Sequence, residues 1–316
     1  MKILVTGAAG FIGSSLCEKL VEQHQVIGLD NFCDYYDVEI KERNIQKLQK
    51  SANFSLIRED IRNRKEIDDI FQNSEIDLVI HLAAMAGVRP SIADPDLYTT
   101  VNINGTVNLL DACRNSGVKN FVFASSSSVY GNNKKVPFSE ADAVDYPISP
   151  YAATKKAGEL ICHTYHHLFD ISLACLRFFT VYGPRQRPDL AIHKFTRKML
   201  KGEAIQVYGD GSTRRDYTYI DDILDGILKS IDFVCEGKKF EVFNLGESQT
   251  ISLKMMIETI ESALNIEAKK EVLPMQPGDV DQTYADVSKA KQMLGYNPTT
   301  KFADGIGKFI EWLKEN

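Results

Sequence analysis

The sequence predicts an α/β fold, a doubly wound parallel sheet with a smaller C-terminal lobe, and three observations support this prediction. Short apolar runs typical of buried strands alternate with helix-length segments through the first part of the chain. A glycine-rich turn follows the first apolar run, and polar or small residues follow the others. Strands joined by helical crossovers run parallel, and such sheets bind ligands at the carboxyl ends of their strands. We therefore expect one binding site along that edge.

The first predicted strand, residues 2–6, leads into the turn Gly7-x-x-Gly10-x-x-Gly13 and a helix to about residue 23. Glycines let the backbone approach a pyrophosphate closely, and the helix start offers free N–H groups and the positive end of its dipole. A strand-to-helix turn that binds nothing can have the same glycines, so the turn alone leaves that alternative open.

The second predicted strand, residues 25–29, ends in Asp30. An acidic residue near this distance from a glycine turn accepts hydrogen bonds from the ribose hydroxyls of a dinucleotide. Its carboxylate would repel a 2′-phosphate, so the dinucleotide predicted here is NAD rather than NADP. The alternative is an aspartate that only forms a turn after the strand, and the preceding glycines disfavour it.

The alternation continues to residue 176. The predicted strands cover residues 54–57, 78–82, 120–124 and 171–176, and the predicted helices cover residues 65–71, 95–115 and 150–169. Because the carboxyl ends of parallel strands lie at one edge of a sheet, five segments should meet there: Gly7, Asp30, Asp60, residues 82–84 and residues 125–128. This arrangement predicts a Rossmann-type domain.

The helix that follows Ser149 carries a candidate general base. Ser149 is a suitable N-cap, and Tyr151 and Lys155 lie one turn apart on the same helix face. A cation at this distance favours the phenolate, which lowers a pKa that is about 10 in an unperturbed tyrosine. The alternative is an ordinary pair on the helix surface, and Tyr130 and Lys134 show the same spacing within a predicted loop.

From residue 180 the sequence changes to loops rich in Pro, Gly and Arg, which predicts the start of the smaller lobe. Residues 219–231 and a strand at residues 240–245 should return to the sheet. The predicted division is a cofactor-binding domain of residues 1–179 plus about 219–246, and a substrate-binding lobe of residues 180–218 plus 247–316.

Composition excludes several classes of function. The 316 residues carry 37 basic and 43 acidic side chains, a net charge of −6, which gives no basic surface for nucleic acid or an anionic membrane. Six scattered cysteines without Cys-x-x-Cys pairs predict neither a disulfide framework nor a metal site. Since Met1 leads directly into a strand and no apolar run approaches 18 residues, we expect a soluble cytoplasmic protein.

Several motifs occur in one order along the chain: Gly7-x-x-Gly10-x-x-Gly13, Asp60-Ile61, His81-Leu-Ala-Ala84, Asn102, Ser125-Ser126, Tyr151-x-x-x-Lys155 and Arg177-Phe-Phe-Thr-Val-Tyr-Gly-Pro184. In this combination they resemble the extended short-chain dehydrogenase/reductase family, specifically its nucleotide-sugar epimerases. Four further segments resemble UDP-glucuronate 4-epimerases: Asp30-Asn-Phe-Cys-Asp-Tyr-Tyr-Asp37, Ala86-Gly-Val-Arg89, Thr180 and Pro274-Met-Gln-Pro-Gly-Asp279.

The resemblance implies NAD-dependent epimerisation at C4 of a UDP-sugar through a transient 4-keto sugar. Tyr151 would take the 4-OH proton while NAD takes the C4 hydride, which returns to the other face of the keto sugar. Lys155 would hold the nicotinamide ribose and lower the tyrosine pKa, and Ser126 would hydrogen-bond to O4. The favoured reaction is UDP-glucuronate to UDP-galacturonate. UDP-glucose or UDP-N-acetylglucosamine is the alternative substrate.

The resemblance also implies which residues of this sequence bind the cofactor and the substrate, because they stand at the positions of the family's binding residues. The cofactor set is Gly7, Gly10, Phe11, Ile12, Gly13, Asp30, Asn31, Asp60, Ile61, Leu82, Ala83, Ala84, Asn102, Tyr151 and Lys155. The substrate set is Arg89, Ser126, Ser127, Ser128, Thr180, Arg185, Arg187, Gln206 and Arg215. No residue is assigned to a metal. The arginines would meet the anionic groups of the substrate, although each of them can also be an ordinary surface residue.

A uronate substrate adds one requirement. Oxidation at C4 makes a β-keto acid, which loses CO2 when its C5–C6 bond stands perpendicular to the carbonyl. An epimerase must therefore hold the carboxylate in another orientation, and the small hydroxyls of Ser127, Ser128 and Thr180 suit this work. Arg187 is the favoured cation for the carboxylate, with Arg185 as its neighbour, while Arg215 matches the family's phosphate-binding arginine.

Other residues bear on the alternatives. The stretch before Val-Tyr-Gly lacks the acidic residues that related dehydratases use, which favours epimerisation. Gln276 and Thr180 stand where better-known hexose epimerases often place Arg and Asn. A catalytically silent NAD-binding regulatory protein would not need the catalytic residues that are intact here. Relatives commonly form homodimers through a four-helix bundle, which here would use the helices at residues 94–115 and 150–169.

Overall fold

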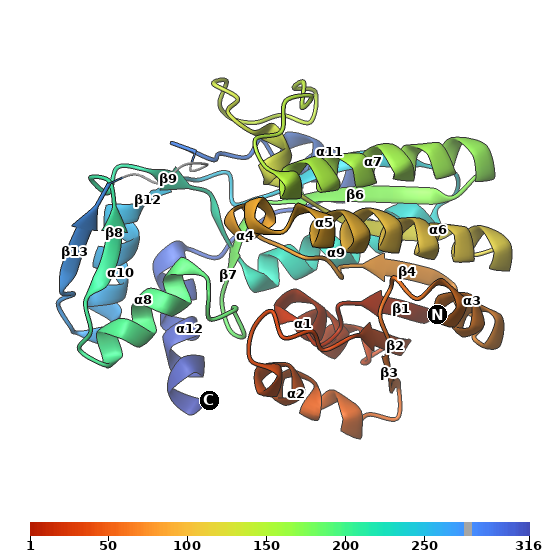
Figure 1. Ribbon diagram of the computed structural model, residues 1–316, viewed down its shortest axis with the longest axis horizontal. Helices are drawn as coiled ribbons and strands as arrows, with labels where there is room; N and C mark the ends of the chain where they lie inside the picture. Colours follow the sequence, from red (N-terminus) through yellow and green to blue (C-terminus); the bar gives the residue numbers. More distant parts are fainter. Residues whose placement is uncertain (275–279) are drawn as a thin grey trace.

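The computed structural model describes residues 1–274 and 280–316, so Gln276 and most of its predicted motif lie outside the described residues. The predicted parallel sheet is confirmed: it has the strand order β11-β6-β5-β4-β1-β2-β3, and every neighbouring pair is parallel (Figure 1). Its strands are β1 (Lys2–Thr6), β2 (Gln25–Asp30), β3 (Phe54–Arg58), β4 (Leu78–His81), β5 (Asn120–Ser126), β6 (Ser172–Phe178) and β11 (Phe240–Leu245).

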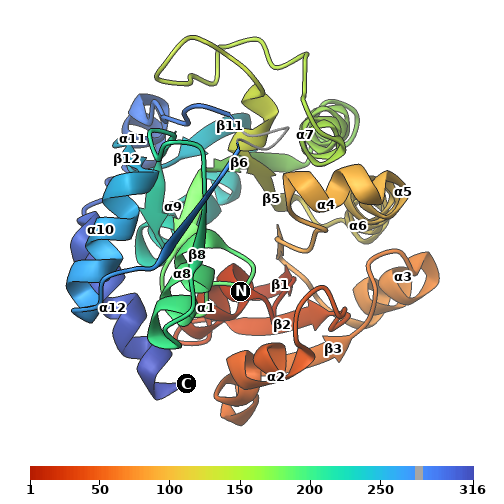
Figure 2. The ribbon, with the colours of Figure 1, turned by 60° about the vertical axis from the view of Figure 1, so that its left-hand side comes forward.

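Helices cover both faces of the sheet, because successive strand residues point to opposite sides. Ile3 and Val5 of β1 belong to the apolar cluster under one face, and Leu4 belongs to the cluster under the other. The first face carries α1 (Phe11–Leu20), α2 (Val38–Gln46) and α9 (Ile220–Cys235), and the second carries α3 (Arg64–Asn73), α6 (Gly105–Ser116) and α7 (Pro150–Phe169) (Figure 2). The strand order reverses between β1 and β4, which opens a crevice at their carboxyl ends.

The helix predicted at residues 95–115 is confirmed, with a π-helical turn inside it that the sequence did not predict. It consists of α5 (Pro95–Thr99), a π-helical turn, η2 (Thr100–Asn104), and α6, and it is preceded by a short helix, α4 (Val88–Ala93). The π turn contains Asn102, whose amide bonds both backbone groups of Met85 and the hydroxyl of Thr154. Such turns often occur at functional sites.

The smaller lobe packs against the α1 and α9 side of the sheet and shares its core (Figure 1). It contains three two-stranded sheets: β7 (Thr180–Tyr182) with β10 (Tyr217–Tyr219), β8 (Ile205–Tyr208) with β13 (Lys270–Leu273), and β9 (Arg214–Arg215) with β12 (Ile251–Ser252). The remaining helices are α8 (Ala191–Leu200), α10 (Leu253–Leu264), α11 (Ser288–Leu294), which packs against α9 and β11, and α12 (Phe302–Glu315). Short 3-10 turns are η1 (Leu48–Lys50) and η3 (Ser127–Tyr130).

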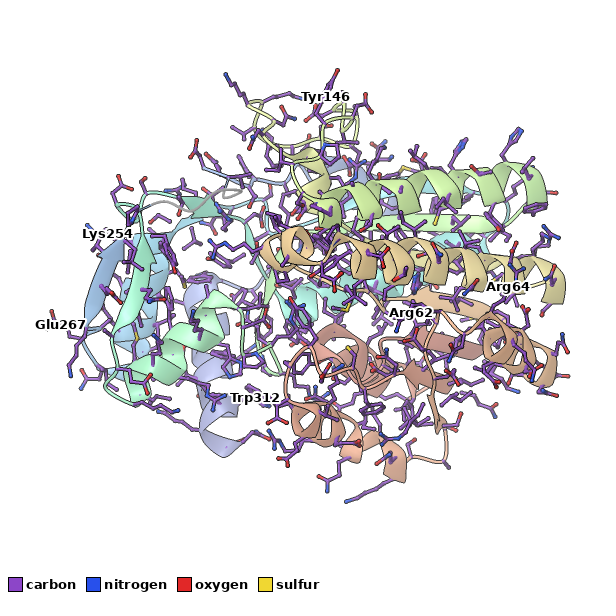
Figure 3. The ribbon with its side chains drawn as sticks, viewed as in Figure 1. Arg62, Arg64, Tyr146, Lys254, Glu267 and Trp312 are labelled. Carbon is purple, nitrogen blue, oxygen red and sulfur yellow. The ribbon has the colours of Figure 1, made fainter. Side chains whose placement is uncertain are left out.

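The loop between η3 and α7 projects away from the sheet and carries the exposed ring of Tyr146 (Figure 3). All six cysteines are free thiols. Within residues 1–274 and 280–316, none of the helices has the length and apolar character needed to cross a bilayer.

Candidate active site

A cavity of about 710 Å³ lies where the predicted strand ends meet. Its lining combines the glycine turn, the ends of β2, β4 and β5, the first turns of α7 and the start of β7. Most of the predicted residues line it: Gly7, Gly10, Phe11, Ile12, Gly13, Asp30, Asn31, Asp60, Ile61, Leu82, Ala83, Ala84, Ser126, Ser127, Ser128, Tyr151, Lys155, Thr180 and Arg187. The fold therefore brings residues from across the chain to one site.

Two glycines of the turn, Gly7 and Gly13, have no room for a side chain. A Cβ on Gly13 would lie 2.1 Å from the carbonyl oxygen of Gly7, and Gly7 itself adopts φ +70°, which disfavours any other residue. Gly10 is the N-cap of α1 and offers no side-chain cap. The first N–H groups of α1 therefore remain available to an anion in the cavity.

Asp30 is buried at the end of β2, where it lines the cavity and also accepts hydrogen bonds from backbone amides of the adjoining turns. One carboxylate oxygen accepts a hydrogen bond from the amide of Ala9 (3.0 Å), and the other accepts from the amide of Phe32 (2.8 Å). The ammonium group of Lys41, on α2, lies 3.9 Å from the same carboxylate. Lys41 also lines the cavity, although none of the sequence motifs includes it.

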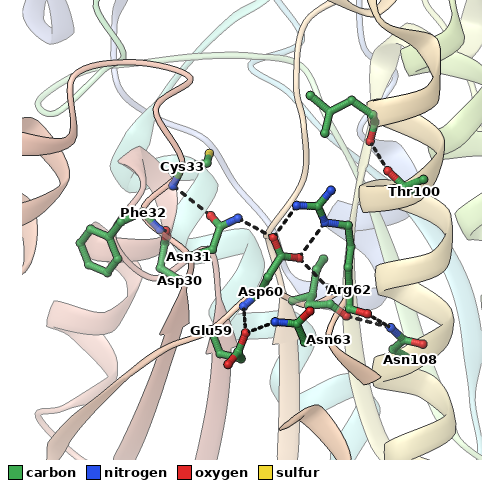
Figure 4. A network of polar contacts seen from close by, with 12 residues as sticks. Asp30, Asn31, Phe32, Cys33, Glu59, Asp60, Arg62, Asn63, Thr100 and Asn108 are labelled. Atoms are coloured by element: carbon green, nitrogen blue, oxygen red, sulfur yellow. Dashed lines mark hydrogen bonds and ion pairs between the residues drawn. The ribbon is translucent and has the colours of Figure 1, made fainter. Parts of the chain in front are cut away.

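Asp60 lies at the end of the neighbouring strand, within the polar network of Figure 4. Arg62 binds both of its carboxylate oxygens, at 3.0 and 2.8 Å, and the side-chain amide of Asn31 donates to one of them at 2.9 Å. Burial alone would raise the pKa of Asp60, but these hydrogen bonds outweigh it and lower the pKa to about 2. Asp60 is therefore a fixed anion that orients Asn31 beside the cavity.

Tyr151 and Lys155 take their positions from the start of α7. The hydroxyl of Ser149 caps this helix by accepting from the amide of Ala152 (3.1 Å). A Cβ on Gly158 would lie 2.4 Å from the ring of Phe123, so glycine allows the helix to approach β5 closely. The close approach places the helix face that carries Tyr151 and Lys155 against the strand end.

The electrostatics of Tyr151 differ from the expectation. Burial raises the pKa of Tyr151, while a hydrogen bond with Ser126 and the charge of Arg187 oppose the rise. Lys155 is not among the groups that lower this pKa. Its ammonium donates to the carbonyl of Ala124 (2.7 Å). Burial also lowers the pKa of Lys155 to about 8, so the amine remains mostly protonated at neutral pH.

The serine run ends β5 and begins η3. The hydroxyl of Ser126 donates to the hydroxyl of Ser128 (3.1 Å) and accepts from its amide (3.2 Å). Ser125 differs from its neighbours, because its hydroxyl donates to the buried carboxylate of Glu159 (2.6 Å). Ser126, Ser127 and Ser128 are thus the hydroxyls that this run offers to the cavity.

Arg187 enters the cavity from the loop after β7. Its Nε and one terminal nitrogen each donate to Asp189 at 2.9 Å, and its guanidinium lies 5.2 Å from the ring centre of Tyr35. The phenol of Tyr35 donates in turn to the carbonyl of Ala86 (2.7 Å). Tyr98 donates to the same carbonyl, and its ring packs edge-on against Tyr151.

The other predicted residues lie elsewhere. Arg185 adopts φ +67° and turns to α1, where it pairs with Glu18 at 2.7 Å. Asn102 is buried and fixes the loop after β4 rather than lining the cavity, as far as the described residues show. Arg89, Gln206 and Arg215 also lie outside the described lining. Arg89 stacks on the ring of Tyr208, whose hydroxyl contacts Gln206, and Arg215 donates to the carbonyl of Arg214.

A buried ion pair behind the serine run was also missed. Arg177 donates two hydrogen bonds, both 2.8 Å, to the carboxylate of Glu159, and a third to the hydroxyl of Tyr130. Arg177 lies in one of the recognised motifs, and Glu159 follows Lys155 by one helical turn. That spacing is the only sequence signal for the pair. The network joins β6 to α7 and so fixes the strand end beneath Ser126.

Comparison with known proteins gives consistent matches. A family model described as GDP-mannose 4,6 dehydratase matches residues 4–309. A UDP-glucuronate 4-epimerase of Thermodesulfobacterium geofontis is 43% identical over 315 residues, which cover 99% of this chain and 96% of that protein.

Two solved structures are similar over their whole length. The UDP-glucuronic acid 4-epimerase of Bacillus cereus, crystallised with UDP-glucuronic acid and NAD, is 42% identical with a TM-score of 0.93, covering 100% of this chain and 99% of its own. The UDP-glucose 4-epimerase of Thermotoga maritima, crystallised with UDP-glucose, is 32% identical with a TM-score of 0.91 and the same coverage.

Proposed function

This chain belongs to the GDP-mannose 4,6-dehydratase family of extended short-chain dehydrogenases/reductases, and we propose that it epimerises UDP-glucuronate to UDP-galacturonate with NAD. It is an NAD-dependent UDP-sugar 4-epimerase that works through a transient 4-keto sugar. The assignment of a uronate substrate depends on one observation, which is that the phenol of Tyr151 and the guanidinium of Arg187 line the same cavity. The first suits the chemistry at C4 and the second suits a carboxylate.

The residues present fit NAD. The glycine turn leaves space and N–H groups for a pyrophosphate, and Asp30 lies at the strand end where ribose hydroxyls would reach it. We propose that Asn31, Asp60 and Ile61 flank the adenosine end, and that residues 82–84 flank the nicotinamide end. When bound, NAD+ supplies the acceptor, and later the donor, of the C4 hydride.

We propose that residues of the protein transfer the proton of the sugar 4-OH group. Tyr151 would take the proton of the 4-OH group and return it after the keto sugar has turned over. Ser126, which hydrogen-bonds to that phenol, would hold O4 and stabilise the phenolate. Lys155 is anchored on the carbonyl of Ala124, and we propose that it holds the nicotinamide ribose rather than acting on the tyrosine directly.

The sugar carboxylate needs a fixed orientation. Ser127, Ser128 and Thr180 line the cavity with hydroxyls, and Arg187 supplies the cation. When several such groups bind the carboxylate, the C5–C6 bond cannot freely become perpendicular to the plane of the C4 carbonyl, which slows the loss of CO2. For the UDP part we retain three candidates, Gln206 and Arg215 on the smaller lobe and Arg89 on α4.

We also propose a homodimer, a cytoplasmic location and two functional units. Leu160 and Leu168 of α7 are 58% and 59% exposed, which suits a helix face that meets a second copy of the chain. Sedimentation of the purified protein tests the dimer. The proposed units remain residues 1–179 plus about 219–246 for NAD and residues 180–218 plus 247–316 for the substrate. The pairing of β11 with β6 supports this division.

The direct test is incubation of the purified protein with UDP-glucuronate, UDP-glucose and UDP-N-acetylglucosamine in separate reactions. We expect the 4-epimer from UDP-glucuronate. Turnover of a neutral sugar with none of UDP-glucuronate would reject the substrate and keep the mechanism. NAD binding without any epimer would instead support a regulatory protein.

A further inference from the structure

The Arg187 guanidinium is held on one edge by a second charged side chain. Its Nε and Nη2 donate to the two oxygens of Asp189, both at 2.9 Å, which is the parallel two-bond geometry of the strongest arginine–carboxylate pairs. The Arg187 side chain is 19% exposed and that of Asp189 is 42% exposed, so Asp189 contacts the arginine from the more open side. The hydrogen bonds from Arg187 outweigh the effect of burial and keep the pKa of Asp189 low.

Two further features restrict the orientation of the Arg187 guanidinium. The ring of Tyr35 lies 5.2 Å from its centre, and the phenol of Tyr35 is tied to the carbonyl of Ala86. Pro188 stands between Arg187 and Asp189, and a proline confines the residue before it to extended backbone. The short Arg-Pro-Asp segment therefore limits how the two charged side chains can face each other.

The pairing leaves one edge of Arg187 for a ligand. A guanidinium has five N–H donors, and Asp189 uses two of them. The remaining terminal nitrogen, Nη1, makes no hydrogen bond with the described residues, although Arg187 lines the cavity. Without Asp189, the guanidinium of Arg187 could change its orientation as the bound carboxylate rotates. Paired with Asp189, it presents its remaining N–H donors from one fixed direction.

We propose that Asp189 is a positioning residue that fixes the Arg187 guanidinium, so that the carboxylate of a bound uronate is held in one orientation and decarboxylation is suppressed. This inference rests on the proposed function. In the side reaction, the C5–C6 bond of the 4-keto acid breaks and CO2 leaves. The electron pair passes into the C4 carbonyl as an enolate, which takes a proton at C5. The decarboxylated pentose product therefore reports how well the carboxylate is held.

The test compares Asp189→Asn with the unmodified enzyme on UDP-glucuronate, by measuring the ratio of decarboxylated pentose to 4-epimer and the KM. Asp189→Asn keeps the size of the side chain and removes its charge. We expect the ratio to rise by about tenfold and the KM to rise with it, because small errors of orientation have large effects on the partition. Asp189→Glu retains the charge and should restore most of the original ratio.

Glu18→Gln is the matched control, since it breaks the Arg185–Glu18 pair of the same loop, outside the cavity lining. It should leave the ratio unchanged. An unchanged ratio in Asp189→Asn would overturn the inference, and so would an equal rise in Glu18→Gln, because that result would point to a general loosening of the loop. An unmodified enzyme that epimerises only neutral sugars would instead reject the proposed function, and the inference with it.

Discussion

The carboxylate of Asp30 lies 3.9 Å from the ammonium of Lys41, and both side chains are almost completely buried beside the cavity. The pair bears on the choice of dinucleotide. A lone Asp30 would repel a 2′-phosphate strongly, but a cation at this distance offsets part of that repulsion. We therefore expect two side chains to set the preference for NAD over NADP, and only Asp30 could be identified from the sequence motif.

Asp30→Ala should lower the affinity for NAD and narrow the preference for NAD over NADP. The variant loses an acceptor for the ribose and also the hydrogen bonds to Ala9 and Phe32, and bonds to a charged group are worth about 1.5–3 kcal/mol each. We expect the Kd for NAD to rise by roughly 10-fold or more, on the basis of one such bond lost to the cofactor. Titration with each dinucleotide measures both changes.

Lys41→Met is the control for that experiment. It removes the cation that offsets Asp30, so the preference for NAD should widen rather than narrow. Equal binding of NAD and NADP by the unmodified protein would contradict the assignment of Asp30 as the selecting residue.

Tyr151→Phe should abolish most turnover while NAD and UDP-sugar still bind, because the ring remains and only the proton carrier is lost. We expect the turnover rate to fall by roughly two orders of magnitude or more, which is the scale of the contribution of general acid–base catalysis. Steady-state kinetics measure the fall, and direct titration shows whether binding is retained. Near-normal turnover would reject Tyr151 as the base.

Tyr130→Phe is the matched variant, and the structure sharpens its expected effect. The Tyr130 hydroxyl donates to Asn244 and accepts from Arg177 in a buried network. Its loss should cost about 1–3 kcal/mol of stability, because the partners are left unsatisfied. Thermal unfolding should therefore report the effect of Tyr130→Phe, and the turnover rate should report that of Tyr151→Phe.

Local signals explain what could be predicted from the sequence. Ser149 as a cap and the one-turn spacing of Tyr151 and Lys155 are properties of a single helix, so they follow from the sequence alone. The meeting of Gly7 and Asp30 at one edge follows from parallel strands, since it needs only the order of strands and helices.

The features that could not be predicted from the sequence depend on long-range packing. Arg185 and Arg187 are two positions apart in one loop, yet a left-handed backbone at Arg185 and a partner on α1 send the first out of the cavity lining. The burial of Tyr151 and the hydrogen bond from Lys155 to the carbonyl of Ala124 both depend on long-range packing, which a helix pattern does not reveal. Helix α2, which supplies Lys41, was not predicted.

Arg187→Ala should reduce activity on UDP-glucuronate and raise the share of decarboxylated pentose in the remaining turnover. The variant removes the guanidinium that we assign to the sugar carboxylate, and the charge-assisted bonds that this group would make are worth about 1.5–3 kcal/mol each. We expect kcat/KM to fall by roughly 10- to 100-fold on that basis. Product analysis and kinetics on the same samples measure both effects.

Arg185→Ala provides the comparison, because it lies in the same loop and pairs with Glu18 outside the cavity lining. Arg185→Ala should lower the stability of the protein and leave the ratio of decarboxylated pentose to 4-epimer nearly unchanged. If Arg185→Ala released more pentose product than Arg187→Ala, the assignment of the two arginines would be reversed.

Stability should fall as pH rises toward 9, and Glu247 should account for part of the fall. Burial raises the pKa of Glu247 from its ordinary value of 4.5 to about 8, and the nearby carboxylates of Asp222 and Asp216 add to the rise. One of its oxygens is buried without a hydrogen-bond partner among the described residues. The folded state therefore keeps a proton that the unfolded chain has already released.

The direction of the effect follows from proton linkage. Between about pH 4.5 and 8 the folded state binds more protons than the unfolded state, so the contribution of Glu247 is fully present below about pH 4.5 and is lost as pH rises through about 8. Glu247→Gln keeps the shape and removes the titration, so it should unfold at a higher temperature than the unmodified protein at pH 9, with a smaller difference at pH 6. Glu258→Gln, on the exposed side of α10, controls for the loss of one negative charge. A difference in melting temperature between Glu247→Gln and the unmodified protein that does not change with pH would show that Glu247 is not protonated in the folded state.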